Sequence, residues 1–409
     1  MEIPLAMQGL DLHEIELVCE VFRSGNLTMG KRVEEFESAF AKYLGTKNAI
    51  MVNSGSSANL LAVEVLKNRS INGVHSLADK EIVVVPAVLW PTSLWPLVQL
   101  GFEVLLIDTV PDSLQMDLSE IRKAKNIFGD RLVGAVIIHP LGFSLDLVEI
   151  QKIKDDLNMW VIEDTCESLG AGVNGSFAGS IGEIGTFSFY YSHHITTVEG
   201  GMVITDDDSI ADELRSARAH GWTRNRKDRN EIETLNPTLN RDFLFVSSGF
   251  NFRPMEFQGA LGVSQLAKLP SFIERRILNI EKIQNGISGT GFEIIDYKKA
   301  KDAQAVDSKS GSVRHSWMAL PISWEGGDAE VSSILQELKT AGIHSRPLLA
   351  GNFTEQPAGH HESIKLFGEL GNSKKTYSKS FMLGNHHNMT ELQIDHLIEN
   401  LVSVASRYE

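Results

Sequence analysis

The stretch VGAVIIHPLGFSLDLVEIQKIKDDLNMWVIED, residues 133 to 164, gives the clearest indication of the fold. It begins and ends with the apolar runs Val133–Ile138 and Met159–Ile162, and the segment between them has helical character. Continuous apolar runs of this length are typical of strands that are buried on both faces, as in parallel sheets covered by helices. Similar runs at Ile82–Pro86 and Val104–Ile107 also alternate with helical segments. The sequence therefore predicts an α/β fold with a large, mostly parallel sheet that binds ligands at the carboxyl ends of its strands.

Chain length and the distribution of strand signals predict two domains. With 409 residues, of which 42% are hydrophobic, the chain can bury one large core and a smaller second one. Beyond about Pro270 a long amphipathic helix leads into a segment with fewer signals of buried strands. We expect an N-terminal arm and a large domain over residues 1–270, and a smaller C-terminal α+β domain over residues 271–409. The charged stretch Thr223–Asp242 lacks periodicity and is expected to be a mobile loop.

Composition disfavours several classes of partner and location. The formal charge of −15 argues against nucleic acid and anionic membranes, which are bound mainly by clustered lysine and arginine. The only cysteines are Cys19 and Cys166, too few for a disulfide framework or a four-cysteine metal cluster. The N-terminus lacks a basic-then-apolar signal, and prolines interrupt the longest apolar stretch. We therefore expect a cytoplasmic enzyme without a membrane segment.

Two motifs at predicted strand ends are suited to an anionic cofactor. The serines and glycine of Ser54–Ser57 precede an apolar helix, where free backbone N–H groups and the helix dipole favour a phosphate. An ordinary serine cap of the helix is the alternative. Asp164 ends a buried strand, and its carboxylate is either a turn residue or the partner of a protonated pyridine nitrogen. Trp90 follows another strand and is either a core aromatic or a stacking surface for a flat ring.

A pair of histidines follows the strand-like segment that includes Ser188. The sequence from Ser188 to Gly201 reads SFYYSHHITTVEGG, with the pair at His193 and His194. Adjacent residues of an extended chain point to opposite sides, so two histidines without a third ligand make a poor zinc site. Histidine also exchanges protons near neutral pH, although a histidine without a role is the alternative for either position. The paired glycines, Gly200 and Gly201, indicate a sharp turn or a close backbone approach.

Several of these motifs, in this order, resemble the DegT/DnrJ/EryC1/StrS family of sugar aminotransferases. The resemblance runs from SGNLTMG (residues 24–30) through SGS (54–56) and IED (162–164) to GFNFRP (249–254). It implies the fold-type I architecture of enzymes dependent on pyridoxal 5'-phosphate (PLP), as in aspartate aminotransferase, with PLP bound to the large domain. It further implies a homodimer with shared active sites. The cofactor-binding residues that it implies are Gly55, Ser56 and Ser188 at the phosphate, Asp164 at the ring nitrogen, Trp90 on a ring face, and Asn251 at the phosphate of the neighbouring subunit.

The sequence departs from the aminotransferase pattern at one position. Family aminotransferases have a lysine five residues after the serine of the Ser-Phe motif, and this chain has His193 there. With the motif GNFT at residues 351–354, this substitution resembles the sugar 3-dehydratases of deoxysugar pathways. The resemblance implies that pyridoxamine 5'-phosphate (PMP) and the catalytic His193 remove the C3 hydroxyl of a nucleotide-linked 4-keto-6-deoxy sugar, GDP-4-keto-6-deoxy-D-mannose, while L-glutamate restores PMP. With only two cysteines, the chain is expected to match the branch without an iron–sulfur cluster.

Other residues are candidates for substrate binding. Arg224, Arg253 and Arg346 are expected to bind the diphosphate of the sugar or the carboxylates of glutamate, or else to form structural ion pairs. Glu167 is expected to lie near the ring oxygen of the cofactor, and the alternative is that it is a solvated carboxylate. Two other functions stay open: an aminotransferase that uses another lysine, such as Lys227, and an inactive family member that binds a ligand.

Overall fold

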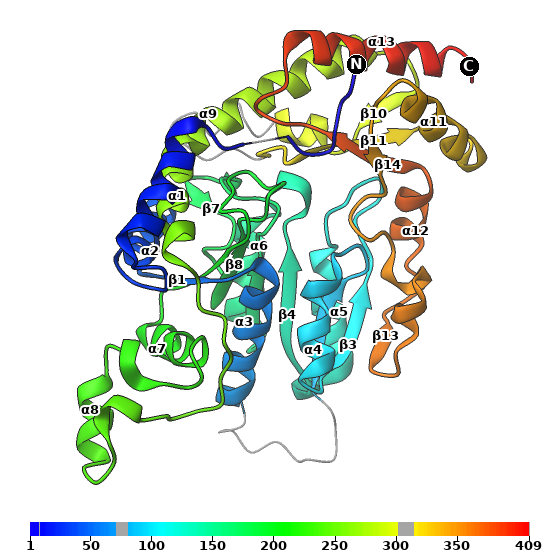
Figure 1. Ribbon diagram of the computed structural model, residues 1–409. Helices are drawn as coiled ribbons and strands as arrows, with labels where there is room; N and C mark the ends of the chain where they lie inside the picture. The colour runs from blue at the N-terminus through cyan, green and yellow to red at the C-terminus, as the bar shows by residue number, and fades with distance from the viewer. Residues whose placement is uncertain (8, 71–80, 302–314, 409) are drawn as a thin grey trace.

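The computed structural model describes residues 1–7, 9–70, 81–301 and 315–408. An eight-stranded sheet forms the centre of the larger part of the molecule, in the order β1-β9-β8-β5-β4-β2-β3-β13 (Figure 1). Its pairs from β13 to β8 are parallel, whereas β9 pairs antiparallel with both β8 and β1. The strands are β1 (Asn48–Val52), β2 (Ile82–Pro86), β3 (Glu103–Ile107), β4 (Leu132–Ile138), β5 (Trp160–Asp164), β8 (Ile184–Ser188), β9 (Gly201–Thr205) and β13 (Ile364–Leu366).

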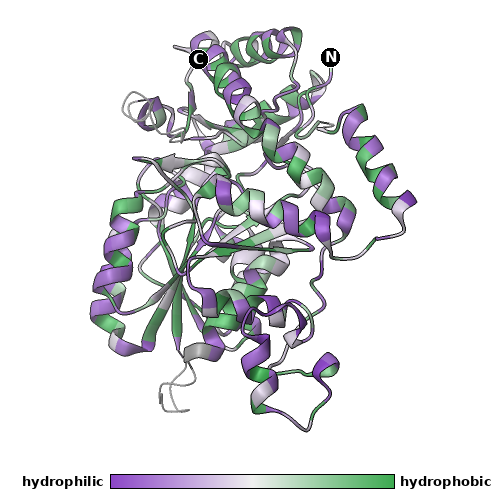
Figure 2. Ribbon diagram, turned by 90° about the vertical axis from the view of Figure 1, so that its left-hand side faces the viewer, coloured by the Kyte–Doolittle hydropathy of each residue, from purple (hydrophilic) through white to green (hydrophobic). Residues whose placement is uncertain are grey.

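Both faces of this sheet are covered, which explains the continuous apolar runs in the sequence. In β2, Val83 and Val85 pack into one buried cluster, and Ile82 and Val84 pack into another on the opposite face. The central strands are accordingly hydrophobic along their length, whereas the outer helices alternate between hydrophobic and hydrophilic residues (Figure 2). The helices of the larger part are α2 (Lys31–Leu44), α3 (Gly55–Ser70), α4 (Trp95–Gln99), α5 (Leu118–Phe128), α6 (Leu147–Asp156) and α7 (Asp208–Ala217).

A smaller antiparallel sheet lies above the larger part in Figure 1. Its strand order is β10-β11-β14-β12, with β10 at Phe292–Ile294, β11 at Ala319–Trp324, β14 at Ser380–Gly384 and β12 at Ser345–Arg346. The helices α11 (Asp328–Thr340) and α13 (Glu391–Ala405) contribute to its buried cluster, as does the end of the long helix α9 (Glu256–Ile287). Further described elements are α1 (Leu12–Ser24), α8 (Arg229–Leu235), α12 (Gly371–Ser378), β6 (Gly172–Val173) and β7 (Ser176–Phe177). The predicted α/β class, with a large parallel and a small second sheet, is confirmed.

The chain crosses between the two parts more than once. α9 continues without interruption through residue 270, where we predicted the domain boundary. Ile3 forms an isolated bridge with Ile343 and packs into the smaller core, and β13 adds to the edge of the large sheet beside β3. The division at residue 270 therefore remains a prediction. In the described part of the chain, no helix has the length and apolar character needed to span a bilayer.

The expectation of a loop over Thr223–Asp242 is wrong. This segment contains the helix α8 (Arg229–Leu235) and short 3-10 turns on either side. An ion pair between Arg229 and Glu233, one turn apart, stabilises the helix, and Trp222 stacks on Phe243 with a ring-centroid distance of 5.7 Å. Charge pairs and aromatic contacts thus order a segment that has no apolar periodicity.

Candidate active site

The predicted site residues gather at the carboxyl edge of the large sheet. Gly55, Trp90, Glu167 and His193 follow β1, β2, β5 and β8 respectively, and the loop after β4 adds Leu141, which was not predicted and whose backbone N–H donates to Glu167. These strands run in one direction, so their following loops lie on the same edge. Hydrogen bonds from Ser316 to Gly142 and from Met318 to Leu141 connect this edge to the start of the smaller sheet. The candidate site therefore lies between the two sheets.

Asp164 is a fixed, buried anion within this site. Its side chain is 5% exposed, and its Oδ2 accepts hydrogen bonds from Asn59 and Ser93, both at 2.7 Å. Its Oδ1 accepts one from the backbone N–H of Cys166 at 3.1 Å, and Asn59 is itself held by the hydroxyl of Thr186. These donors fix the orientation of the carboxyl group. With both carboxyl oxygens held by hydrogen bonds, the side chain of Asp164 has one fixed orientation, which suits the recognition of a cationic group.

The start of α3 forms a narrow cradle in which the backbone of Gly55 approaches Ser188 closely. Gly55 is the first residue of this helix, and a Cβ atom there would lie 2.6 Å from Cβ of Ser188. Gly201 approaches closely as well, because a Cβ atom there would lie 2.3 Å from the carbonyl oxygen of Ser54, which accounts for the glycine pair in the sequence. Ser56 is exposed at the helix start, where the dipole favours a phosphate. The structure therefore brings Gly55, and with it the adjacent Ser56, against Ser188, while their role at a phosphate remains a prediction.

We expect Gly55→Ala to weaken both folding and phosphate binding. The added methyl group must displace Ser188, and overpacking of this kind costs about 1–3 kcal/mol of unfolding free energy. Gly371→Ala is the matched control, because Gly371 also begins a helix but has no atom within 4 Å of the added methyl group. Denaturant unfolding and titration with PLP measure the two effects. If Gly55→Ala and Gly371→Ala had the same stability and the same affinity for PLP, the start of α3 would not be the phosphate site.

The two histidines lie in different surroundings. His194 is 1% exposed and its Nε2 lies 3.1 Å from the carbonyl oxygen of Ser316, whereas His193 is partly exposed with Nδ1 3.1 Å from Sδ of Met318. Burial lowers the pKa of His193 to about 4, with Arg276 and Arg346 acting in the same direction and Asp164 opposing them. Burial likewise lowers the pKa of His194. Both rings are therefore neutral near pH 7. Across the described ranges, no three histidine, cysteine, aspartate or glutamate side chains are arranged to hold a metal ion.

Arg346, Trp90 and Glu167 form one wall of the site. The guanidinium group of Arg346 lies 5.6 Å from the ring centroid of Trp90, which is 45% exposed and thus accessible to a ligand. Burial raises the pKa of Glu167 to about 7, a direction that Asp164 supports, whereas the backbone N–H of Leu141 and the charge of Arg346 lower it. Glu167 is half-buried, and its place near the cofactor remains a prediction.

The structure does not bring the other predicted residues to this wall. Arg224 is exposed, with its guanidinium group 4.1 Å from the ring centroid of Trp222. Arg253 and Asn251 are also exposed and hydrogen-bond to each other at 3.0 Å. Among the described residues, no hydrogen bond joins Asn251 to Gly55, Ser56 or Ser188 of its own chain. The substrate roles of Arg224 and Arg253 remain predictions.

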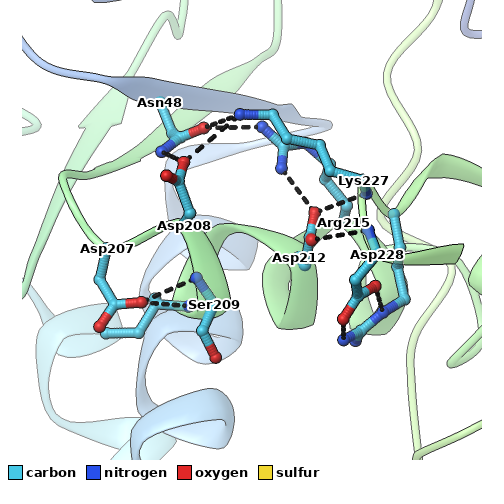
Figure 3. Close-up of polar contacts among 10 residues, drawn as sticks. Asn48, Asp207, Asp208, Ser209, Asp212, Arg215, Lys227 and Asp228 are labelled. Carbon is cyan, nitrogen blue, oxygen red and sulfur yellow. Dashed lines mark hydrogen bonds and ion pairs between the residues drawn. The ribbon is translucent and has the colours of Figure 1, made fainter. Parts of the chain in front are cut away.

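Lys227 lies at the wrong end of the sheet to act as a cofactor-binding lysine. Its Nζ donates to Oδ1 of Asn48 at 3.1 Å and lies 3.4 Å from Asp208, within a polar cluster beside α7 (Figure 3). Asn48 is the first residue of β1, whereas the cradle follows the last residue of that strand. The aminotransferase alternative that uses Lys227 is therefore disfavoured by the geometry.

Sequence reasoning missed the residues that hold the site residues in place. Asn59 and Ser93 position Asp164 but lie 105 and 71 positions from it. Met318 contacts His193 across 125 positions. Ser93 and Met318 belong to no motif, so no local signal identifies them. Asn59 lies in the helix predicted after Ser54–Ser57, and its position near the start of that helix is the one signal that could have pointed to it.

The chain is similar to known proteins over nearly its whole length. The family described as the DegT/DnrJ/EryC1/StrS aminotransferase family matches residues 9–402. A protein of Yersinia pseudotuberculosis named GDP-4-keto-6-deoxy-D-mannose 3-dehydratase is 33% identical over 416 residues, which cover 100% of this chain and 99% of the relative.

Two solved structures are similar over nearly the whole chain. One is a GDP-4-keto-6-deoxymannose-3-dehydratase with a trapped PLP–glutamate geminal diamine, with a TM-score of 0.83, 31% identity and 100% coverage of both chains. The other is a variant of the enzyme ColD in which a histidine and the serine directly before it are replaced by lysine and asparagine. Its TM-score is 0.83 at 32% identity, and the match covers 97% of this chain and 100% of that one. From the match to the family over most of its length, the chain belongs to the DegT/DnrJ/EryC1/StrS aminotransferase family.

Proposed function

We propose that this chain is a PLP- and PMP-dependent 3-dehydratase that removes the C3 hydroxyl group of GDP-4-keto-6-deoxy-D-mannose. The observation that carries the proposal is the place of His193, which stands where family aminotransferases have lysine and lies in the loop after β8, at the sheet edge where β5 ends in Asp164. Ser192-His193 is the only Ser-His pair in the sequence, and a Ser-His pair is what was replaced in the ColD variant. The relative named above supports the substrate.

The residues of the site fit PLP and PMP. The close contact that a Cβ atom at Gly55 would make shows a cradle without room for a side chain, at a helix start suited to a phosphate group. Asp164 supplies the fixed negative charge that keeps a pyridine nitrogen protonated. When bound, the cofactor supplies an amine that condenses with the C4 ketone and a ring that accepts electrons. The protein must supply the proton transfers.

His193 performs these transfers in our proposal. Its low pKa leaves the imidazole neutral, so it can take up a proton from the reacting carbon in the first step. The imidazolium that results then donates a proton to the departing C3 hydroxyl oxygen. One residue thus acts first as base and then as acid. Arg346, on the wall beside Trp90, is placed to bind the diphosphate or a glutamate carboxylate with two parallel hydrogen bonds.

Glutamate is the proposed co-substrate, and this leads to a stoichiometric prediction. Each dehydrated sugar should be accompanied by one ammonia and one 2-oxoglutarate, because the amine is lost by hydrolysis and replaced from glutamate. The reaction should proceed with a metal chelator and without a reductase, as expected from two cysteines, both free. Mass spectrometry of the sugar and enzymatic assays of the two small products measure this balance. A requirement for a reduced iron–sulfur partner would contradict the assignment to the branch without a cluster. A comparison of sugars linked to GDP, CDP, dTDP and UDP in the same assay identifies the nucleotide.

We also propose that the enzyme is a cytoplasmic homodimer in which Asn251 completes the phosphate site of the partner subunit. Within the described part of its own chain Asn251 is exposed, its side chain accepts a hydrogen bond from Arg253, and its backbone forms an isolated bridge with Ala219. Tyr190 and Tyr191, just before His193, and Met255, just after Arg253, are exposed apolar side chains that a partner would cover.

Mixed dimers test this shared site. We expect Asn251→Ala and His193→Asn each to be poorly active alone, and a coexpressed mixture to regain activity. A hybrid dimer contains one site in which neither residue is substituted, if Asn251 acts across the interface. The maximum recovery is about a quarter of the wild-type activity for random pairing of equal amounts, since about half of the dimers are hybrids with one intact site. No recovery, despite hybrid dimers shown by native mass spectrometry, would contradict the shared site.

A further inference from the structure

A short segment before β11 contacts both histidines of the pair. In the segment His315–Met318, the backbone N–H of Ser316 donates to Gly142 at 2.7 Å and that of Met318 donates to Leu141 at 3.0 Å. From the other side, the fully buried Arg276 donates to the carbonyl oxygen of Met318 at 2.7 Å. The segment is therefore held firmly against the loop that follows β4.

This segment fixes the protonated nitrogen of His194. Nε2 of His194 lies 3.1 Å from the carbonyl oxygen of Ser316, which can only accept a hydrogen bond. Nε2 must therefore carry the proton, and Nδ1 must carry the lone pair. That Nδ1 is buried and has no hydrogen-bond partner among the described residues. His194 thus has no accessible basic nitrogen.

The same reasoning gives the opposite result for His193. Nδ1 of this ring lies 3.1 Å from Sδ of Met318, and a thioether sulfur accepts a hydrogen bond but has no proton to donate. The contact is favourable only when Nδ1 carries the proton. Nε2 then carries the lone pair, and the described residues provide no hydrogen bond to it.

We propose that the segment His315–Met318 sets opposite tautomers on the adjacent histidines, so that Nε2 of His193 is the base and Met318 is its positioning residue. This inference rests on the proposed function of His193 but adds which nitrogen reacts and what selects it. It also explains why only one histidine of the pair is suited to proton transfer.

Nitrogen NMR tests the tautomers without any assay of activity. The full-length protein with bound PMP is prepared with 15N-labelled histidine, because protonated and unprotonated ring nitrogens differ widely in chemical shift. The variants His193→Asn and His194→Asn assign the two rings by loss of their signals. We expect a proton on Nδ1 for His193 and on Nε2 for His194 near pH 7. A proton on Nε2 of wild-type His193 overturns the proposal while leaving the dehydratase activity to be judged separately by its products.

Met318→Leu tests what selects the tautomer. Leucine keeps the approximate volume but removes the sulfur acceptor, so a population of His193 with the proton on Nε2 should appear. The kcat for dehydration should fall roughly two- to threefold, the lower end of the range for one hydrogen bond, because a thioether is a weak acceptor, and KM for the sugar should stay unchanged. Met382→Leu is the matched control, because Met382 packs in the same buried cluster, and it should change neither quantity. If Met318→Leu leaves the tautomer of His193 as in the wild type, Met318 does not select it.

Discussion

His193→Asn is expected to slow both half-reactions by roughly 10²- to 10⁴-fold, the usual contribution of a general acid–base group. Sugar dehydration and restoration of PMP by glutamate each require a proton to move at the same carbon of the cofactor. Asparagine is similar in size to part of the imidazole ring but takes up no proton near neutral pH. The losses should therefore be linked, while the affinity for PLP changes little. Single-turnover spectra of each half-reaction, together with a binding titration, measure the three quantities.

Two further variants define what would contradict this result. His194→Asn should retain both proton transfers, although it removes a buried hydrogen bond to Ser316 and is expected to lower stability. If His193→Asn kept full activity and His194→Asn abolished it, the base would be the second histidine of the pair. His193→Lys should instead capture PLP covalently, as a yellow form whose mass increases permanently after borohydride reduction, and should dehydrate poorly. If both asparagine variants kept full activity, the proposed mechanism would be wrong.

Asp164→Asn is expected to slow both half-reactions by roughly 10²- to 10³-fold, the usual effect of removing one electrostatic group from an active site. A neutral amide no longer keeps the pyridine nitrogen protonated, so the ring accepts electrons poorly in either direction. Cofactor binding should persist in part, because the cradle at the start of α3 is unchanged. The two half-reactions are followed by absorbance, and the binding of PMP by fluorescence.

Ser93→Ala is the matched control for Asp164. It removes one of the two side-chain hydrogen bonds to Oδ2 but keeps the carboxylate charge, so a loss of only about fivefold is expected. A graded series, from wild type through Ser93→Ala to Asp164→Asn, would support the role of the charge. A normal rate of PMP restoration by glutamate in Asp164→Asn would show that Asp164 is not the partner of the ring nitrogen.

The fold and the first members of the site could be predicted because their signals are local. The apolar runs Ile82–Pro86 and Val133–Ile138 predicted strands that the structure confirms as β2 and β4, since a strand buried on both faces needs successive apolar residues. Ser54–Ser57 and Asp164 follow such strands directly. Their positions at the carboxyl edge therefore follow from the strand direction alone.

Local signals failed where long-range contacts supply the stabilisation. The helix α8 forms in a stretch without apolar periodicity, because charge pairs and the stacking of Trp222 on Phe243 order it. Likewise β13 is only three residues long and becomes a strand by pairing with β3, which lies far earlier in the chain. Neither kind of contact can be identified from a short window of sequence.

The sequence by itself determined the type of fold, the carboxylate Asp164, and the histidine in place of lysine at position 193. Only the tertiary structure showed how the surroundings of His193 and His194 differ, because the difference lies in Met318 and Ser316, on a segment more than 120 positions away. It also distinguished Arg346 from Arg224 and Arg253, three residues of the same type. The physical reason is that residue type and strand direction are encoded locally, whereas the pKa, tautomer and accessibility of a side chain depend on whichever groups folding brings around it.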